Sequence, residues 1–174
     1  MGLACVEYKN QSFRCIGHKV VRVMSESDGT WGSRLKTIFL SVQEAIEVWQ
    51  PDAVAVEEVF FAKNAQSALK LGQARGAALA AIAVLDLPLF EYSATTVKQT
   101  LTSSGRAEKM QVQNMVRLLL GASLREHGEF SREDASDALA IAICHAQQNH
   151  KLSILQNSSS PSLKNTKKIG SFFL

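Results

Sequence analysis

The stretch AVAV at residues 53–56 constrains the fold most strongly, because it is apolar on both sides yet short and rich in valine. Runs of this kind are typical of strands buried on both faces of a sheet. Apolar residues recur at helical spacing over residues 33–49 before it, and a long helix is predicted over 62–84 after it. Another short apolar run, residues 87–92, then follows. Strands that alternate with helices in this way predict an α/β fold.

The rest of the chain predicts a hairpin at the start and further helices toward the end. Residues 3–8 and 13–23 have the pattern of two strands, and the polar letters KNQS between them predict a turn. Gly121 begins a polar stretch that we expect to be a loop through residue 130. Three more helices are expected, at about residues 94–101, 107–120 and 132–149.

Composition changes near residue 150 and suggests where the folded domain ends. The chain has four lysines and no acid from Lys151 onward, and from Asn157 it is rich in Ser, Asn and Lys. Segments of this composition bury too little apolar surface to order themselves. We therefore expect one domain over residues 1–150 and a flexible basic tail over residues 151–174.

Cysteine usage and hydropathy bear on where the protein resides. Cys5, Cys15 and Cys144 are scattered, with no metal-binding spacing, which predicts free thiols in a reducing cytosol. The longest apolar run, residues 76–85, is about half as long as a membrane span requires. The expected location is the cytoplasm.

Two aspartates stand where an acidic segment becomes apolar, in SREDASDALAIAIC at residues 131–144. Helical spacing places Asp134 and Asp137 on the stripe that continues with Ile141. Asp134 could cap the helix, because Ser131 and Asp134 match a capping box. Asp137 lies inside the helix, where a buried carboxylate is costly unless it is paired. A cation beside the two aspartates is one explanation.

Glu57 supplies a third carboxylate, at the end of the 53–56 strand. In the alternating strand pattern Ala53, Ala55 and Glu57 share one side, and strand ends are where α/β sheets place ligand sites. Three carboxylates would offer hard oxygen ligands to Mg²⁺, and two such ions can assist phosphodiester cleavage. The alternative is that Glu57 or Glu58 only solvates the strand exit.

Basic and aromatic side chains follow Glu57 closely. Phe60 and Phe61 neighbour Lys63, and aromatic rings beside lysines can engage bases while the cations bind phosphates. From Phe61 to Arg117 there are seven basic residues against three acidic ones, which suits a polyanionic partner. Core phenylalanines and a solvated basic face remain the alternatives.

Three runs carry a family resemblance: AVEEVFFAKNAQSALKLGQARG, VKQTLTSSGRAEKMQVQNMV and DASDALAIAICH. Together they resemble the RuvC family of bacterial Holliday-junction resolvases, over roughly residues 3–147. The resemblance implies an RNase H-like fold, with a mixed sheet and helices on both faces. It also implies a homodimer whose subunits each nick one of two opposed strands of a four-way DNA junction in recombination and repair. RuvA and RuvB would be its partners.

The resemblance also assigns roles to single residues. Glu57, Asp134 and Asp137 match catalytic acids that, with a fourth, hold Mg²⁺, and Mn²⁺ could substitute. Phe60 matches an aromatic that engages bases near the junction centre. Lys98 and Lys109 match lysines that contact DNA near the scissile phosphate.

One feature of the family is absent at the N-terminus. Family members begin with a central strand ending in a pattern like Gly-Ile-Asp-Pro-Gly-Ser, whose aspartate is the first catalytic carboxylate. Here GLACVEYKNQ aligns with the second strand, so the first central strand is expected to be missing. An incomplete N-terminus is the preferred account. The alternatives are a junction-binding protein that does not cut and an RNase H-like nuclease that acts on RNA.

Overall fold

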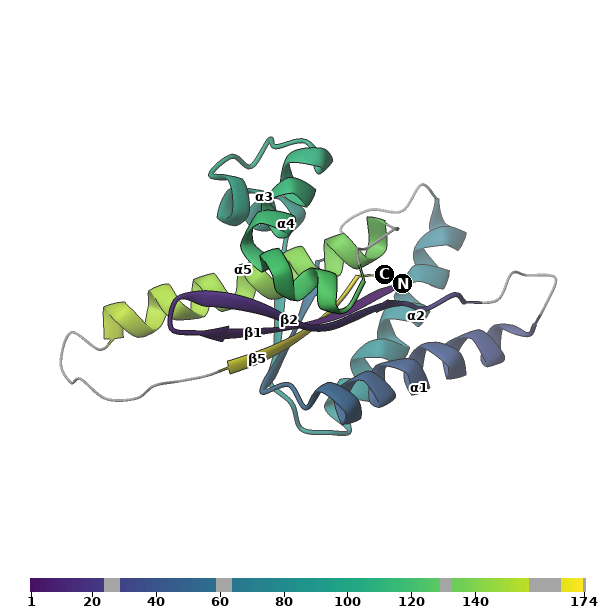
Figure 1. Cartoon of the computed structure of the whole chain (residues 1–174). Coiled ribbons are helices and arrows are strands. Elements are labelled where there is room, and N and C mark those ends of the chain that lie inside the picture. The colour runs from purple at the N-terminus through teal and green to yellow at the C-terminus, as the bar shows by residue number, and fades with distance from the viewer. Residues whose placement is uncertain (24–28, 59–63, 129–132, 157–166, 174) are drawn as a thin grey trace.

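The computed structural model describes residues 1–23, 29–58, 64–128, 133–156 and 167–173. Five strands form one mixed sheet, and helices cover both of its faces (Figure 1). This arrangement confirms the predicted α/β fold, a mixed sheet with helices on both faces. In chain order, the described elements are β1 Gly2–Lys9, β2 Ser12–Val20, α1 Trp31–Trp49, β3 Ala53–Glu57, α2 Ala65–Ala83, β4 Leu89–Tyr92, α3 Ala94–Thr102, α4 Lys109–Glu126, α5 Glu133–Gln156 and β5 Lys167–Phe173.

The hairpin of β1 and β2 forms as its turn residues predict. The strands pair antiparallel, with Lys9 opposite Ser12. Asn10 and Gln11 both adopt positive φ angles, 51° and 62°, and complete a two-residue turn. Such turns match the right-handed twist of the strands, and asparagine tolerates the conformation.

Short polar side chains cap the N-termini of three helices. Thr30, Asn64 and Ser93 each accept a hydrogen bond from the backbone N–H three residues later, at the starts of α1, α2 and α3. Each cap satisfies one of the donors that a helix N-terminus leaves unpaired. These caps place the helix starts close to where the sequence pattern predicts them.

The expected loop over residues 121–130 is wrong in its first part. Gly121 does leave the helical conformation, with φ 48° and ψ −126°, but helical structure resumes and α4 continues to Glu126. Leu124 in this turn is buried, and the Ser123 hydroxyl accepts a 3.0 Å hydrogen bond from the N–H of Cys15. Packing against β2 therefore holds a turn that local sequence would leave open.

The centre of the sheet is filled by the last strand of the chain. The strand order is β2-β1-β5-β3-β4, and β5 runs antiparallel to β1 and parallel to β3. The expected flexible tail over residues 151–174 is thus corrected in two parts: residues 151–156 belong to α5, and residues 167–173 form β5. β5 occupies the central position, between β1 and β3, where the family's first strand is expected to be missing (Figure 1).

Specific contacts set the register of β5. The N–H of Lys168 donates to the Asp52 carboxylate at 2.7 Å, and the N–H of Asp52 donates to the Lys168 carbonyl at 2.8 Å. Gly170 faces the Pro51 ring, where an added Cβ would lie 3.1 Å from a ring carbon. β5 therefore begins at a reciprocal pair of hydrogen bonds and passes a point that favours glycine.

Two core layers lie on opposite faces of the sheet. The layer toward α5 contains Ala53 and Ala55 of β3, together with buried residues of α3 and α4. The layer toward α1 and α2 contains Val54 and Val56. β3 therefore alternates between the two layers, and Glu57 continues the α5 side of that alternation.

The described residues contain three free and buried cysteines, as the sequence predicts. Burial raises the pKa of the Cys5 thiol to about 12 and that of Cys15 to about 11, so both stay protonated. Within the described ranges, none of the helices combines the length and apolar character that crossing a membrane requires.

Candidate active site

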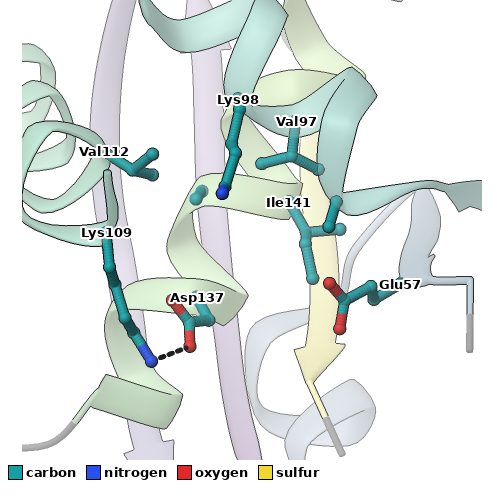
Figure 2. Close-up of a pocket in the computed structure, with 9 residues that line it drawn as sticks. Glu57, Val97, Lys98, Lys109, Val112, Asp137 and Ile141 are labelled. Atoms are coloured by element: carbon teal, nitrogen blue, oxygen red, sulfur yellow. Dashed lines mark ion pairs between the residues drawn. The ribbon is translucent and has the colours of Figure 1, made fainter. Parts of the chain in front are cut away.

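A cavity of about 240 Å³ opens at the C-terminal end of β3. Its polar lining comes from four elements: Glu57 from β3, Lys98 from α3, Lys109 from α4 and Asp137 from α5. Apolar residues of the three helices form the remaining wall. Figure 2 shows Lys98 pointing into this space, and Lys109 reaching the Asp137 carboxylate.

Glu57 is held at the strand end by its backbone. Arg75 of α2 donates a 2.6 Å hydrogen bond to the Glu57 carbonyl and forms a 2.9 Å ion pair with Glu91 of β4. Arg75 thereby ties the exits of two parallel strands to one helix. The Glu57 side chain remains available on the α5 side of the sheet.

The two carboxylates of the cavity are electrostatically destabilised. Burial raises the pKa of Glu57, the charge of Asp137 raises it further, and Lys109 and Arg75 oppose the shift. Burial also raises the pKa of Asp137, against the opposing effect of Lys109. Partly buried carboxylates that repel each other are stabilised by a cation between them, and hard oxygen donors suit Mg²⁺. Glu57 and Asp137 therefore fit a divalent metal.

Lys109 contacts two acids of the neighbouring helix. Its Nζ lies 3.0 Å from Asp137 Oδ2 and 2.8 Å from Glu133 Oε2. Burial opposes its charged form, but the hydrogen bonds with Glu133 and Asp137 outweigh burial and raise the pKa of Lys109. The lysine starts α4, where Glu108 and Gln111 form a capping box. The start of α4 thus fixes the position of the Lys109 backbone, from which the side chain extends to the two acids.

Asp134 lies one helical turn before Asp137 and has a different neighbour. Its Oδ2 is 3.4 Å from the Met1 amine, and its side chain is 40% exposed. An added Cβ at Gly2 would lie 2.0 Å from the Asp134 carbonyl oxygen, so glycine permits β1 to approach this turn of α5. Asp134 does not line the cavity that Glu57 and Asp137 share.

The structure thus brings some of the predicted site residues together and leaves others apart. Glu57, Asp137, Lys98 and Lys109 meet in one cavity. In the described part of the chain, no three His, Cys, Asp or Glu side chains cluster closely enough to hold one metal ion. Phe60 and Lys63 lie outside the described residues.

Two residues of the site were missed by sequence reasoning. Glu133 precedes Asp137 by four positions, and that spacing alone could have placed it on the same helix face. Arg75 contacts residues 18 and 16 positions away, Glu57 and Glu91. No local pattern in the sequence marks such a contact.

The fold and this site define an RNase H-like α/β protein with carboxylates and lysines in one cavity at a strand end. The family model described as "Crossover junction endodeoxyribonuclease RuvC" matches residues 1–145. The chain therefore belongs to the RuvC family of crossover junction endodeoxyribonucleases, nucleases named for their action on crossover junctions.

Several relatives carry the same description. The protein of Haemophilus ducreyi is 44% identical over 167 residues, covering 96% of this chain and 83% of the relative. That of Vibrio parahaemolyticus is 40% identical over 163 residues, covering 94% and 90%. That of Geotalea uraniireducens is 52% identical over 117 residues, which span 67% of this chain and 66% of the relative.

A solved structure shares the fold. RuvC of Thermus thermophilus in complex with a Holliday junction substrate is 35% identical, with a TM-score of 0.76. The likeness covers 87% of this chain and 89% of that one. The sheet with β5 at its centre is thus similar in overall architecture to an enzyme seen on junction DNA.

Proposed function

We propose that this chain binds four-way junction DNA and nicks it by Mg²⁺-dependent phosphodiester hydrolysis. The observation that carries the proposal is that Glu57 and Asp137 meet Lys98 and Lys109 in one cavity. Carboxylates for a metal and ammonium groups for a phosphate are the two kinds of side chain that this chemistry requires.

Each cavity residue has a distinct part in the proposed reaction. Glu57 of β3 and Asp137 of α5 would hold the metal, and Asp134 would assist from the adjacent turn of α5. When bound there, Mg²⁺ would supply Lewis acidity for the hydrolysis. Lys98 and Lys109 orient the scissile phosphate and offset its negative charge. Arg75 keeps the end of β3 in place, so that the Glu57 carboxylate keeps its position in the cavity.

The wider assembly is proposed from the family. Phe60 engages bases near the junction centre and Lys63 binds a phosphate beside it. The protein acts in the cytoplasm as a homodimer with two opposed sites, and it receives junctions from RuvA and RuvB. These assignments are supported by the family membership and by the relative that was solved with a Holliday junction substrate.

A junction-cleavage assay tests the proposed function. Purified protein is incubated with a synthetic four-way DNA junction and Mg²⁺, and products are compared with those from linear duplex and from an RNA–DNA hybrid. We expect paired nicks in the junction alone, and loss of nicking in Asp137→Asn with binding retained. Equal cutting of the hybrid would favour an RNA-directed nuclease, and full cleavage by the variant would refute the assigned role of Asp137.

A further inference from the structure

The two lysines of the cavity differ in the ion pairs that they form. Lys109 is paired with two carboxylates, whereas Lys98 has no ion pair among the described residues. Both side chains carry one positive charge and both line the same space (Figure 2). The difference therefore lies in what each ammonium group contacts.

The acids that hold Lys109 are unequal. Glu133 is 70% exposed, and an ion pair at such a surface is weak because water competes for both charges. Asp137 is only 18% exposed, and a carboxylate withdrawn from water needs a compensating cation. The contact with Asp137 is therefore the one that matters for the charge balance of the cavity.

The Lys109 ammonium group contacts one oxygen of the Asp137 carboxylate, which is suited to bind a metal ion. Its Nζ lies 3.0 Å from Asp137 Oδ2, within hydrogen-bonding distance. A divalent cation bound to that same oxygen would lie close to the ammonium and be repelled by it. A metal and Lys109 would therefore compete for Asp137.

We propose that Lys109 is the resident counter-ion of Asp137, and that it must withdraw before Asp137 can bind a divalent cation. Lysine suits this role, because a flexible stem lets its ammonium group leave one anion for another. A DNA phosphate offers an alternative anion at the same cavity. The inference deepens the proposed function, on which it rests for the identity of the metal, and it concerns how metal entry is regulated.

A metal titration without DNA tests the counter-ion role directly. Mn²⁺ serves as the probe, and free Mn²⁺ is measured by electron paramagnetic resonance for the unmodified protein and for Lys109→Gln. Removing one positive charge beside the ligand should lower the Kd for Mn²⁺ by roughly tenfold. Lys109→Arg keeps the charge, and should leave the Kd within about twofold of the unmodified protein.

Lys98→Gln is the matched control, because it removes the same charge from the same cavity without breaking a contact with Asp137. We expect its Kd to change by less than a third of the change in Lys109→Gln. Circular dichroism and thermal melts verify that each variant is folded. Lys109→Met, which removes the charge but keeps an unbranched side chain, replaces the glutamine variant if that variant unfolds, with the same tenfold gain in Mn²⁺ affinity expected.

Three results would overturn the proposal. They are an unchanged or weaker Mn²⁺ affinity in folded Lys109→Gln, an equal gain in Lys98→Gln, and a gain in Lys109→Arg as large as in the glutamine variant. Because no DNA is present, failure of this test is separate from failure of the proposed function. A protein that cuts no junction can still show the competition, and an active nuclease can lack it.

Discussion

The hydroxyl of Ser171 donates a 2.6 Å hydrogen bond to the carbonyl of Ala138, and so joins the central strand to the helix that carries Asp137. Both residues are buried. The bond links β5 to α5 one residue from a metal-ligand candidate. This hydrogen bond therefore connects the central strand of the sheet to the segment of α5 that carries Asp137.

Ser171→Ala should lower the free energy of unfolding by about 1 kcal/mol, because it removes one buried hydrogen bond. Urea denaturation measures the change. Ser12→Ala, at an exposed position at the start of β2, is the control, and should stay within about 0.5 kcal/mol of the original. Equal effects at the two positions would show that the Ser171 bond adds nothing.

Phe173→Asp should strengthen metal binding. In the parallel register Val56 lies opposite Phe172, so residue 173 comes next to Glu57 on the central strand. The sequence of β5, KKIGSFF, contains no acid. A carboxylate added there should lower the Kd for Mn²⁺ by roughly tenfold and raise the nicking rate. Phe173→Asn is the neutral control, and matching gains in both variants would exclude a charge effect.

Arg75→Gln should lower the free energy of unfolding by roughly 1.5–3 kcal/mol, the range for hydrogen bonds to charged groups. The larger share belongs to the Glu57 carbonyl, because Glu91 is 46% exposed and its ion pair is screened by water. Glu91→Gln should therefore cost less than about 1 kcal/mol. If Glu91→Gln equals Arg75→Gln in urea melts, the ion pair rather than the backbone contact holds the strand end.

The metal-free protein should become more stable as pH falls from neutral through the titration range of Glu57. Burial and the charge of Asp137 raise the pKa of Glu57 above 4.5, its ordinary value, so the folded state binds the proton more tightly than the unfolded state. The charged form therefore destabilises the fold above the raised pKa. Glu57→Gln should be more stable than the original at pH 7 and show a flatter profile. An unchanged slope in thermal melts across pH 4 to 7 would contradict this.

Junction affinity should fall steeply with salt through release of counterions from DNA. Lys98→Gln should reduce the slope of log affinity against log salt concentration by about 1, the effect of one lost phosphate contact. Lys36→Gln on α1, which covers the opposite face of the sheet, is the charge-matched control. Fluorescence anisotropy with a labelled junction measures both slopes. A loss of slope in the control would point to net charge alone.

Local patterns sufficed for the elements whose contacts are local. The hairpin turn at Asn10 and Gln11, the strand that ends at Glu57 and the apolar stripe after Asp137 all depend on neighbours within one or two turns of chain. Glu57 and Asp137 could be predicted because Glu57 ends β3 and Asp137 lies near the start of α5. The family resemblance then brought Lys98 and Lys109 to the same site.

The position of β5 could not be read from its own residues. It depends on contacts such as Lys168 with Asp52, which are 116 residues apart, and on pairing with β1 at the other end of the chain. Lysines and serines nearby favour a solvated tail when only local composition is considered. The Lys109–Asp137 pair was missed for the same reason, since it joins two helices through their tertiary packing.

The place of β5 in the chain has a consequence for biosynthesis. Among the described elements it is the last to leave the ribosome, yet it lies between β1 and β3. A nascent chain can therefore form the β2-β1 hairpin and the β3-β4 pair, but the two half-sheets keep facing edges open until residues 167–173 emerge. Exposed strand edges invite pairing with other chains. During synthesis, the open edges of β1 and β3 therefore favour aggregation until that last segment emerges.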